Sequence, residues 1–264
     1  MTGIEPKVDY EIRETVGWIT LNRPQKLNAL ASDMREQFLA HVKAAGADDT
    51  VRSLVVVGAG GGFCAGGDIG HMVELQSNSD EAGFRHLLQI GNEAILALQA
   101  FPGLTVAAVN GIAAGAGLSL ALACDLRFAT PNASFSAPWI KLGLVPDWGA
   151  SFWLPKLVGV GKALEIVTTG ETVSAEVAER IGLITGIIPH ADFQVAVQDR
   201  VIRLGAPRQA VAHAKRLIRL GSEDSLEAAM ARETESQEEC FETGDFKEGL
   251  TAFLENRLAS FEGK

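Results

Sequence analysis

The sequence predicts an α/β fold, with one large domain and a helical region at its C-terminal end. Two observations carry this prediction. Short apolar runs rich in β-branched residues recur along the chain, and the segments between them place apolar residues at helical spacing. Hydrophobic residues make up 47% of the 264 residues, which is enough to fill a sizeable core. Strands that alternate with helices are joined by crossovers, as in α/β proteins.

The first elements of the core follow from simple patterns. Residues 8–21 alternate apolar and polar side chains around Gly17, which predicts a hairpin. Residues 33–45 are predicted to be helical, because Asp33 can cap the helix and apolar side chains follow on one face. Residues 54–57 form a continuous apolar run, and glycines follow directly. This pattern is typical of a buried parallel strand that ends in a loop.

The alternation continues along the chain. The next predicted elements are a helix at residues 81–100, a strand at 105–109, a small-residue helix from about residue 116, and a strand at 126–129. Beyond Gly159 the spacing is mostly helical, with one short strand at residues 183–188, and residues 207–264 contain three predicted helices. We therefore expect an α/β core at residues 1–200. Residues 201–264 are expected to form a helical region that packs on a neighbouring subunit or covers the site.

Composition excludes several classes of function. The formal charge is −10 and the isoelectric point is near 5.0, so neither nucleic acid nor an anionic membrane surface is expected as the main partner. The cysteines (Cys64, Cys124 and Cys240) are odd in number and lack a CxxC spacing, which predicts neither a disulfide framework nor a zinc site. The histidines show no metal-binding spacing, so no metal is expected. No signal peptide is recognised, and a reduced, cytoplasmic compartment is expected.

One segment raises the question of a membrane span. Residues 103–124 contain no charged side chain, and residues 111–115 match the GxxxG motif of paired membrane helices. The turn dipeptide Asn110-Gly111 lies in the middle, however, and residues 105–109 have the pattern of a short buried strand. Basic flanks and aromatic belts are also missing. We therefore expect a strand, a turn and a buried helix here.

Two glycine-rich loops each follow a predicted strand. The first, residues 58–68, has six glycines but lacks both the GK[ST] of a phosphate loop and the last glycine of GxGxxG. The second, residues 110–117, opens the small-residue helix, where free N–H groups stabilise negative charge. Two such loops can aim two N–H groups at one oxygen, which is the arrangement of an oxyanion hole. A flexible surface loop and close helix packing remain alternative readings of these glycines.

A lone acid, Asp147, follows an apolar run and directly precedes Trp148. If the carboxyl is enclosed, desolvation raises its pKa, which suits proton transfer near neutral pH. The alternative is a turn aspartate with a local structural role.

A serine-hydrolase reading competes with this one. Residues 117–121 approximate the GxSxG elbow, and Asp147 followed by His190 or His213 has the required order. The elbow places its serine on a sharp strand-to-helix turn, whereas Ser119 lies about ten residues after the predicted strand. A role in helix packing is therefore expected for Ser119.

Several ordered segments together resemble the enoyl-CoA hydratase/isomerase (crotonase) family over nearly the whole chain. The matching segments are residues 21–24, 27–30, 63–69, 109–117, 123–125, 141–147 and 248–254. The resemblance implies a crotonase-like spiral of ββα units with a C-terminal helical region, assembled as a homotrimer or a dimer of trimers. It also implies a coenzyme A thioester as substrate and an enolate formed at the thioester carbonyl. Coenzyme A would be part of the substrate, so no separate cofactor is expected.

The resemblance also implies roles for particular residues. The oxyanion-hole donors would be the backbone N–H groups of Gly67 and Ala116. Contacts to coenzyme A or to the substrate are expected from Lys26 (and Arg23), Ala65, Asp68, Ile69 and Trp139. The two basic side chains would supply the local positive patch that an acidic protein needs to bind phosphates.

The implied reaction depends on which carboxylates are present. Hydratases of this family use two glutamates, and the matching positions here hold Ser119 and Trp139. Asp147 instead matches the single acid of the family's enoyl-CoA isomerases, which removes a proton from C2 and returns it at C4. Residues 113–117 and 142–147 look closest to the branch that rearranges 1,2-epoxyphenylacetyl-CoA. An acyl-CoA isomerase of fatty acid metabolism or aromatic compound degradation is therefore expected.

Three alternatives stay open. The 4-chlorobenzoyl-CoA dehalogenases of the family share the pair found here as Trp139 and Asp147, and they use the aspartate as a nucleophile. They also use a histidine as a base, and Asn92 occupies that position here, which weakens the dehalogenase reading. His86 is close in sequence, and either it or His71 could line a pocket. Hydration of an enoyl-CoA would need a second acid. A non-catalytic acyl-CoA-binding module is the third alternative, and the retained glycine loops and acid argue against it.

Overall fold

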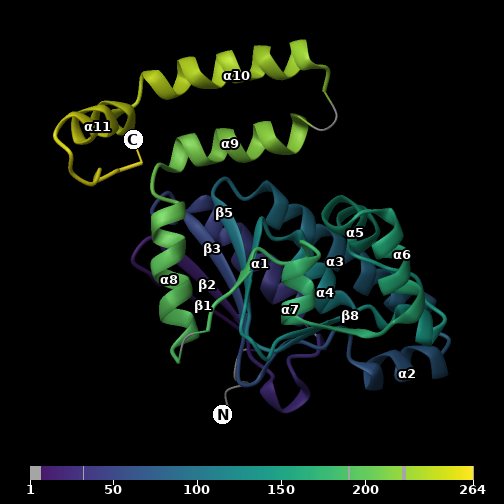
Figure 1. Ribbon diagram of the computed structural model, residues 1–264. Coiled ribbons are helices and arrows are strands. Elements are labelled where there is room, and N and C mark those ends of the chain that lie inside the picture. Colours follow the sequence, from purple (N-terminus) through teal and green to yellow (C-terminus); the bar gives the residue numbers. More distant parts are fainter. Residues whose placement is uncertain (1–6, 32, 190, 222–223, 264) are drawn as a thin grey trace, which may run out of the picture.

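The computed structural model describes residues 7–31, 33–189, 191–221 and 224–263. Its centre is a six-stranded sheet with the strand order β1-β2-β3-β5-β7-β10 (Figure 1). The strands β1 and β2 pair antiparallel, and every other neighbouring pair in this sheet is parallel. The bounds are β1 (Val8–Arg13), β2 (Val16–Leu21), β3 (Ser53–Gly58), β5 (Leu104–Val109), β7 (Leu126–Ala129) and β10 (Gly186–Ile187).

The predicted N-terminal hairpin is confirmed, but its turn lies at Glu14 and not at Gly17. Glu14 adopts a left-handed backbone with φ of 56°, whereas Gly17 pairs with Ile12 inside the ladder. A Cβ added at Gly17 would lie 3.1 Å from Leu54 and from Tyr10. The glycine therefore permits close packing on the strand, and the turn forms elsewhere.

A second sheet completes the core. Its strand order is β4-β6-β8-β9, and only β8 and β9 pair antiparallel. Three successive strand pairs, β3-β4, β5-β6 and β7-β8, each place the first strand in the large sheet and the second in the small one, and helices follow each pair. The predicted α/β fold and its spiral of ββα units are thereby confirmed. The bounds are β4 (Gly62–Cys64), β6 (Ile112–Ala114), β8 (Ser134–Ser136) and β9 (Thr172–Ser174).

Helices cover both faces of the large sheet (Figure 1). They are α1 (Met34–Ala47), α2 (Ile69–Ser77), α3 (Glu81–Ala100), α4 (Ala116–Ala123), α5 (Ala150–Val158), α6 (Val160–Thr169), α7 (Ala175–Arg180) and α8 (Phe193–Leu204), with the 3₁₀ turns η1 (Pro24–Lys26) and η2 (Pro138–Leu142). Asp33 precedes α1 as predicted but does not cap it. Its backbone is not extended, and its carboxylate accepts hydrogen bonds from Lys7 and Gln37 instead.

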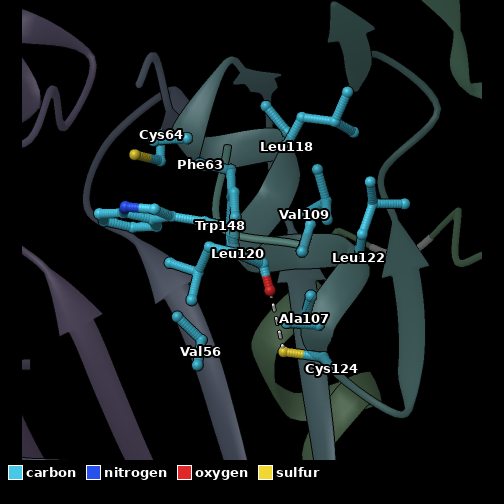
Figure 2. Packing of buried hydrophobic residues seen from close by; sticks show 14 of the residues in the cluster. Val56, Phe63, Cys64, Ala107, Val109, Leu118, Leu120, Leu122, Cys124 and Trp148 are labelled. Atoms are coloured by element: carbon cyan, nitrogen blue, oxygen red, sulfur yellow. Dashed lines mark hydrogen bonds between the residues drawn. The ribbon is translucent and has the colours of Figure 1, made fainter. Parts of the chain in front are cut away.

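The apolar run of β3 divides between two hydrophobic clusters. Leu54 and Val56 belong to the larger cluster, and the alternating Val55 and Val57 belong to the smaller one with α8. Strand side chains alternate between faces, so a strand covered on both faces is apolar throughout. Figure 2 shows the larger cluster, in which residues of β3, β4, β5 and α4 and the side chain of Trp148 pack together.

Helix α4 explains the uncharged segment that resembled a membrane span. All eight of its residues are buried, because it packs between β4, β5, β6, α3 and α5. The segment before it forms β5 and β6, as the turn dipeptide predicted. Among the described residues, no helix is long and apolar enough to cross a membrane. The apolar character of the segment therefore reflects burial by protein.

The C-terminal helices extend away from the sheets (Figure 1). They are α9 (Arg208–Gly221), α10 (Leu226–Phe241) and α11 (Gly244–Leu254). Helix α9 is attached to the core through Asp125, which forms ion pairs with Lys215 at 2.9 Å and with Arg219 at 2.5 Å. Lys215 also donates to the carbonyl oxygens of Phe101 and Gly103. The preceding helix α8 runs through residue 200 and packs on the large sheet, so the extended part begins with α9.

Candidate active site

The two predicted glycine loops meet at one place in the structure. The first loop follows β3 and contains β4, and the second follows β5, contains β6 and ends in the start of α4. A Cβ added at Gly66, which has φ of 94°, would lie 2.7 Å from the Ala114 carbonyl oxygen and 3.4 Å from the Ala116 nitrogen. A Cβ added at Gly117 would lie 2.1 Å from the Cys64 carbonyl oxygen. The two loops therefore contact each other at distances that only glycine permits.

This contact leaves two backbone donors at the same cavity. Leu30 pairs with the first loop through the Gly66 carbonyl oxygen and the Asp68 N–H, which leaves the N–H of Gly67 between them. Ala116 is the first residue of α4, where an N–H has no acceptor within the helix. Within the described part of the chain, no hydrogen bond uses the N–H of Gly67 or of Ala116. Both residues line one cavity, as an oxyanion hole requires.

Asp147 lies between η2 and α5 and lines the same cavity. The Ser119 hydroxyl donates to the Asp147 carbonyl oxygen at 3.0 Å and holds the main chain of the acid. The next residue, Trp148, has a left-handed backbone with φ of 47°, which costs about 1–2 kcal/mol for a residue other than glycine. Its indole packs on α3 at Gly91, where a Cβ would lie 1.9 Å from the ring. This packing compensates for the backbone strain and fixes the segment.

The environment of Asp147 suits proton transfer. Burial raises the pKa of the Asp147 carboxyl above its ordinary value, and this outweighs the opposing effects of the Trp139 side chain, the Asp147 backbone and the Arg35 guanidinium. One carboxylate oxygen, Oδ1, is buried and has no hydrogen-bond partner. The acid therefore meets the condition of enclosure under which proton transfer was considered, and one of its oxygens is available to a reacting proton.

The cavity is small and mostly apolar. It has a volume of about 80 Å³. The side chains around the loops and the acid come from α2, α3, η2 and the segment after η2, and include Met72, Phe84, Leu87, Leu88, Leu142 and Leu144. A larger cavity of about 850 Å³ shares several of these residues and extends along α2 and α3. An apolar chain entering from the larger cavity would reach the loops and Asp147.

Some of the predicted substrate contacts lie at this cavity and others do not. Ala65, Ile69 and Trp139 line it together with the acid. Asp68 is absent from its lining, because the Asp68 carboxylate binds Arg23 at 2.5 Å and caps α2 by accepting from the His71 N–H. Lys26 is an exposed residue of η1 and lines neither cavity.

Arg35 is a residue of the site that the sequence did not indicate. This residue is in the first turn of α1, is only 5% exposed, and lines the cavity together with mostly apolar residues. Burial lowers the pKa of the Arg35 guanidinium, while Cys64, Glu36 and Asp147 oppose that shift. One signal could have revealed it, since Arg35 precedes Leu39 by four residues and so shares its buried helix face.

The competing readings lose their geometric basis. Ser119 is fully buried inside α4 and donates to backbone carbonyl oxygens, so it is no strand-to-helix nucleophile. His213 pairs with Glu239 in the C-terminal helices, and His190 lies outside the described residues. Asn92 is exposed and, like His71 and His86, does not line the small cavity.

Metal and thiol chemistry have no visible basis in the described residues. The part of the chain that the structure describes contains no group of three or more side chains able to hold a metal ion. Cys64 and Cys124 are buried, and burial raises the pKa of each thiol to about 12. Both thiols donate to backbone carbonyl oxygens, the Cys124 bond being drawn in Figure 2. They are packing residues of the core, as expected for Cys64.

Comparison with known proteins agrees with this geometry. The profile of the family described as enoyl-CoA hydratase/isomerase matches residues 11–264. The crotonyl-CoA hydratase of Syntrophomonas wolfei is 35% identical over 256 residues, 96% of this chain and 97% of its own. The 1,2-epoxyphenylacetyl-CoA isomerase of Escherichia coli is 32% identical over 255 residues, 96% of this chain and 97% of its own.

A solved structure gives the same result for the fold. The crystal structure of an enoyl-CoA hydratase from Bacillus anthracis superposes with a TM-score of 0.91 at 29% identity, covering 98% of this chain and 100% of that one. The superposition covers nearly the whole length of both chains, so the fold described above is shared with this relative. The chain therefore belongs to the enoyl-CoA hydratase/isomerase (crotonase) family.

Proposed function

We propose that the protein is an acyl-CoA isomerase that uses one acid, Asp147, and an oxyanion hole formed by the N–H groups of Gly67 and Ala116. One observation carries the proposal. Asp147 supplies the only carboxyl group among the described residues that line the small cavity. The names of the relatives include both hydratases and an isomerase, so family membership alone leaves the reaction open. The number of acids in the cavity is the feature that favours isomerisation.

One carboxylate is sufficient for a double-bond shift. In a 3-enoyl-CoA, ionised Asp147 would remove a proton from C2 while the two N–H groups stabilise the oxygen of the resulting dienolate. Protonated Asp147 would then return the proton at C4 and form the 2-enoyl-CoA. The raised pKa supports both halves of this cycle, because it brings the acid nearer to neutral pH. Rearrangement of a ring-epoxide phenylacetyl-CoA would use the same acid and the same oxyanion hole.

Hydration of an enoyl-CoA is the less favoured reaction. The family's hydratase positions hold Ser119, which is buried and bound to the Asp147 carbonyl oxygen, and Trp139, which has no ionisable group. Neither can activate a water molecule or protonate carbon as a carboxyl group does.

The remaining expectations belong to the same proposal. Ala65 and Ile69 line the cavity and would contact the pantetheine arm, whereas Asp68 would contribute through its main chain. Lys26 is exposed and would contact the phosphates of coenzyme A, whereas Arg23 is already bound to Asp68.

Exposed apolar side chains of α10, α11 and the chain after them support assembly as a homotrimer or a dimer of trimers. They are Leu226, Phe241, Phe253, Leu254 and Leu258. A cytoplasmic location is proposed on the composition of the chain.

The test is an absorbance assay of the purified protein with 3-hexenoyl-CoA and, separately, with 2-hexenoyl-CoA. We expect formation of the 2-enoyl thioester from the first substrate and no addition of water to the second. The Asp147→Asn variant should keep its fold and lose about 10²–10⁴-fold in kcat, as is typical for removal of a general base. Undiminished activity in that variant would refute the role of Asp147.

The remaining outcomes point to the alternatives. Rapid hydration would mean that a second acid reaches the cavity in the assembled enzyme. If neither substrate reacts, chloride release from 4-chlorobenzoyl-CoA would favour the dehalogenase reading, and thioester binding without turnover would favour a non-catalytic module.

A further inference from the structure

Arg35 is a charged side chain with unused hydrogen-bond donors at the end of an apolar cavity. Its side chain is 5% exposed, and both Nε and Nη1 are buried without a partner among the described residues. No ion pair joins Arg35 to any acid in the same described part of the chain. A guanidinium is always charged in proteins and carries five N–H donors. Unpaired buried donors of this kind are rare in folded proteins and call for an explanation.

The location of the guanidinium connects it to the reacting groups. A Cβ added at Gly67 would lie 3.8 Å from Arg35 Nη2, which places this nitrogen beside the proposed oxyanion-hole residue. The guanidinium carbon lies 5.6 Å from the centre of the Trp148 ring, next to Asp147 in the chain. Arg35 therefore lies beside the point where the acyl group would be held, well away from the exposed Lys26 expected to meet the phosphates.

The charge of the cavity indicates what kind of group would pair with Arg35. Arg35 and Asp147 are the only ionisable residues among those described in its lining, and their charges cancel when both are ionised. A neutral oxygen bound to Arg35 preserves this balance. A carboxylate on the acyl group would add a second negative charge to a desolvated space that already contains Asp147. A neutral acceptor is therefore favoured over an acid.

We propose that Arg35 forms a subsite for a neutral acceptor oxygen, such as a hydroxyl, carbonyl or epoxide oxygen, on the acyl group of the thioester. This inference rests on the proposed function, because it uses the same acyl cavity. It makes oxygenated acyl-CoA thioesters the preferred substrates, ahead of plain enoyl-CoA thioesters such as 3-hexenoyl-CoA. A plain hydrocarbon chain would leave the Arg35 donors unpaired. A site built around buried hydrogen-bond donors discriminates strongly against an analogue that lacks the acceptor.

Three four-carbon thioesters that differ only at the terminal carbon test this inference. They are butyryl-CoA with a methyl group, 4-hydroxybutyryl-CoA with a neutral oxygen, and succinyl-CoA with a carboxylate. Their dissociation constants for the full-length oligomer are measured by calorimetry. We expect 4-hydroxybutyryl-CoA to bind at least about tenfold more tightly than butyryl-CoA, the gain expected for a hydrogen bond to a charged donor.

Two variants assign the preference to Arg35. Arg35→Met keeps the unbranched, flexible stem of the side chain without its donors and should remove the preference for the hydroxylated ligand. Arg85→Met is the matched control, because Arg85 is an exposed arginine that lines only the larger cavity. It should retain the preference. Thermal unfolding checks that each variant is folded, and the comparison of ligands on the unaltered enzyme is a test that needs no variant.

Each outcome decides the proposal. Equal binding of butyryl-CoA and 4-hydroxybutyryl-CoA to the unaltered enzyme would overturn it, as would a preference that survives Arg35→Met. Tightest binding of succinyl-CoA would overturn the choice of a neutral oxygen. These measurements contain no chemical step, so a failure here is distinguishable from failure of the isomerase assay, which tests the proposed function separately.

Discussion

Replacing Gly117 with alanine tests whether the contact between the two glycine loops holds the oxyanion hole in place. Gly117 is the second residue of α4 and directly follows the proposed donor Ala116. A Cβ there would lie 2.1 Å from the Cys64 carbonyl oxygen and 2.7 Å from Cys64 Cβ. The obstructing oxygen belongs to the backbone of β4, which is paired with β6, so it cannot rotate away as a side chain would.

Two effects of opposite sign determine the magnitude. In an ordinary helix, replacing glycine with alanine stabilises by about 1 kcal/mol. Overpacking a core costs about 1–3 kcal/mol, and a clash with paired backbone belongs at the upper end of that range. We therefore expect Gly117→Ala to lower the free energy of unfolding by about 2 kcal/mol. Relief of the clash would also move the neighbouring N–H, and a displacement of about 1 Å at a catalytic group lowers kcat/KM by roughly 100-fold.

The assay compares this variant with a matched control. Gly61→Ala changes a glycine of the first loop where an added Cβ would meet no atom within 4 Å. Its free energy of unfolding should stay within about 0.5 kcal/mol of the unaltered protein. Both are measured by urea unfolding at one protein concentration, because an oligomer's stability depends on concentration. A Gly117→Ala variant with the stability and activity of the control would refute the argument that the loops are locked together.

Three further outcomes are expected. The Asp147 base must be ionised, and burial raises its pKa, so kcat/KM should begin to fall at a higher pH than it would with an ordinary aspartate. A pH–rate profile whose acidic side falls only near the ordinary aspartate pKa of about 3.9 would contradict this. Asp125→Asn should lower the free energy of unfolding by about 3 kcal/mol, since it removes the charge of a largely buried carboxylate that Lys215 and Arg219 contact. A negligible change in urea unfolding would show that other contacts hold α9. Ser119→Ala should cost about 1 kcal/mol of stability through its lost hydrogen bond, with a much smaller loss of kcat than Asp147→Asn; an equal loss would revive the serine nucleophile.

Predictions that depended on neighbouring residues were largely confirmed. The apolar run of β3 lies in a strand covered on both faces, and the uncharged segment forms β5, β6 and α4. For Asp147 the local pattern left an enclosed acid and a turn aspartate open, and the structure encloses the carboxyl. Local pattern was sufficient here because strand alternation, helix period and the freedom of glycine are properties of a few adjacent residues.

Predictions about contacts between distant segments were less complete. Asp68 was expected to line the coenzyme A path mostly through its main chain, and the sequence did not indicate that its carboxylate binds Arg23 and caps α2. Arg35 has the sequence context of an ordinary charged residue on a helix, yet the packing of α1 against the first loop and Trp148 buries it in the cavity. Spacing could have indicated that Arg35 lies on a buried helix face, but it gives neither residue's partner, since that is set by which elements pack together.

The sequence by itself therefore determined the α/β alternation, the two glycine loops and the lone acid, and with them the resemblance to a family that handles coenzyme A thioesters. Only the tertiary structure decided that the loops contact each other, that Asp147 is the one carboxyl in the described cavity lining, and that Arg35 lies beside it. The physical reason is that backbone preference acts over a few residues, whereas burial, and with it the pKa of an acid and the unmet hydrogen bonds of a buried cation, depends on residues far apart in the chain.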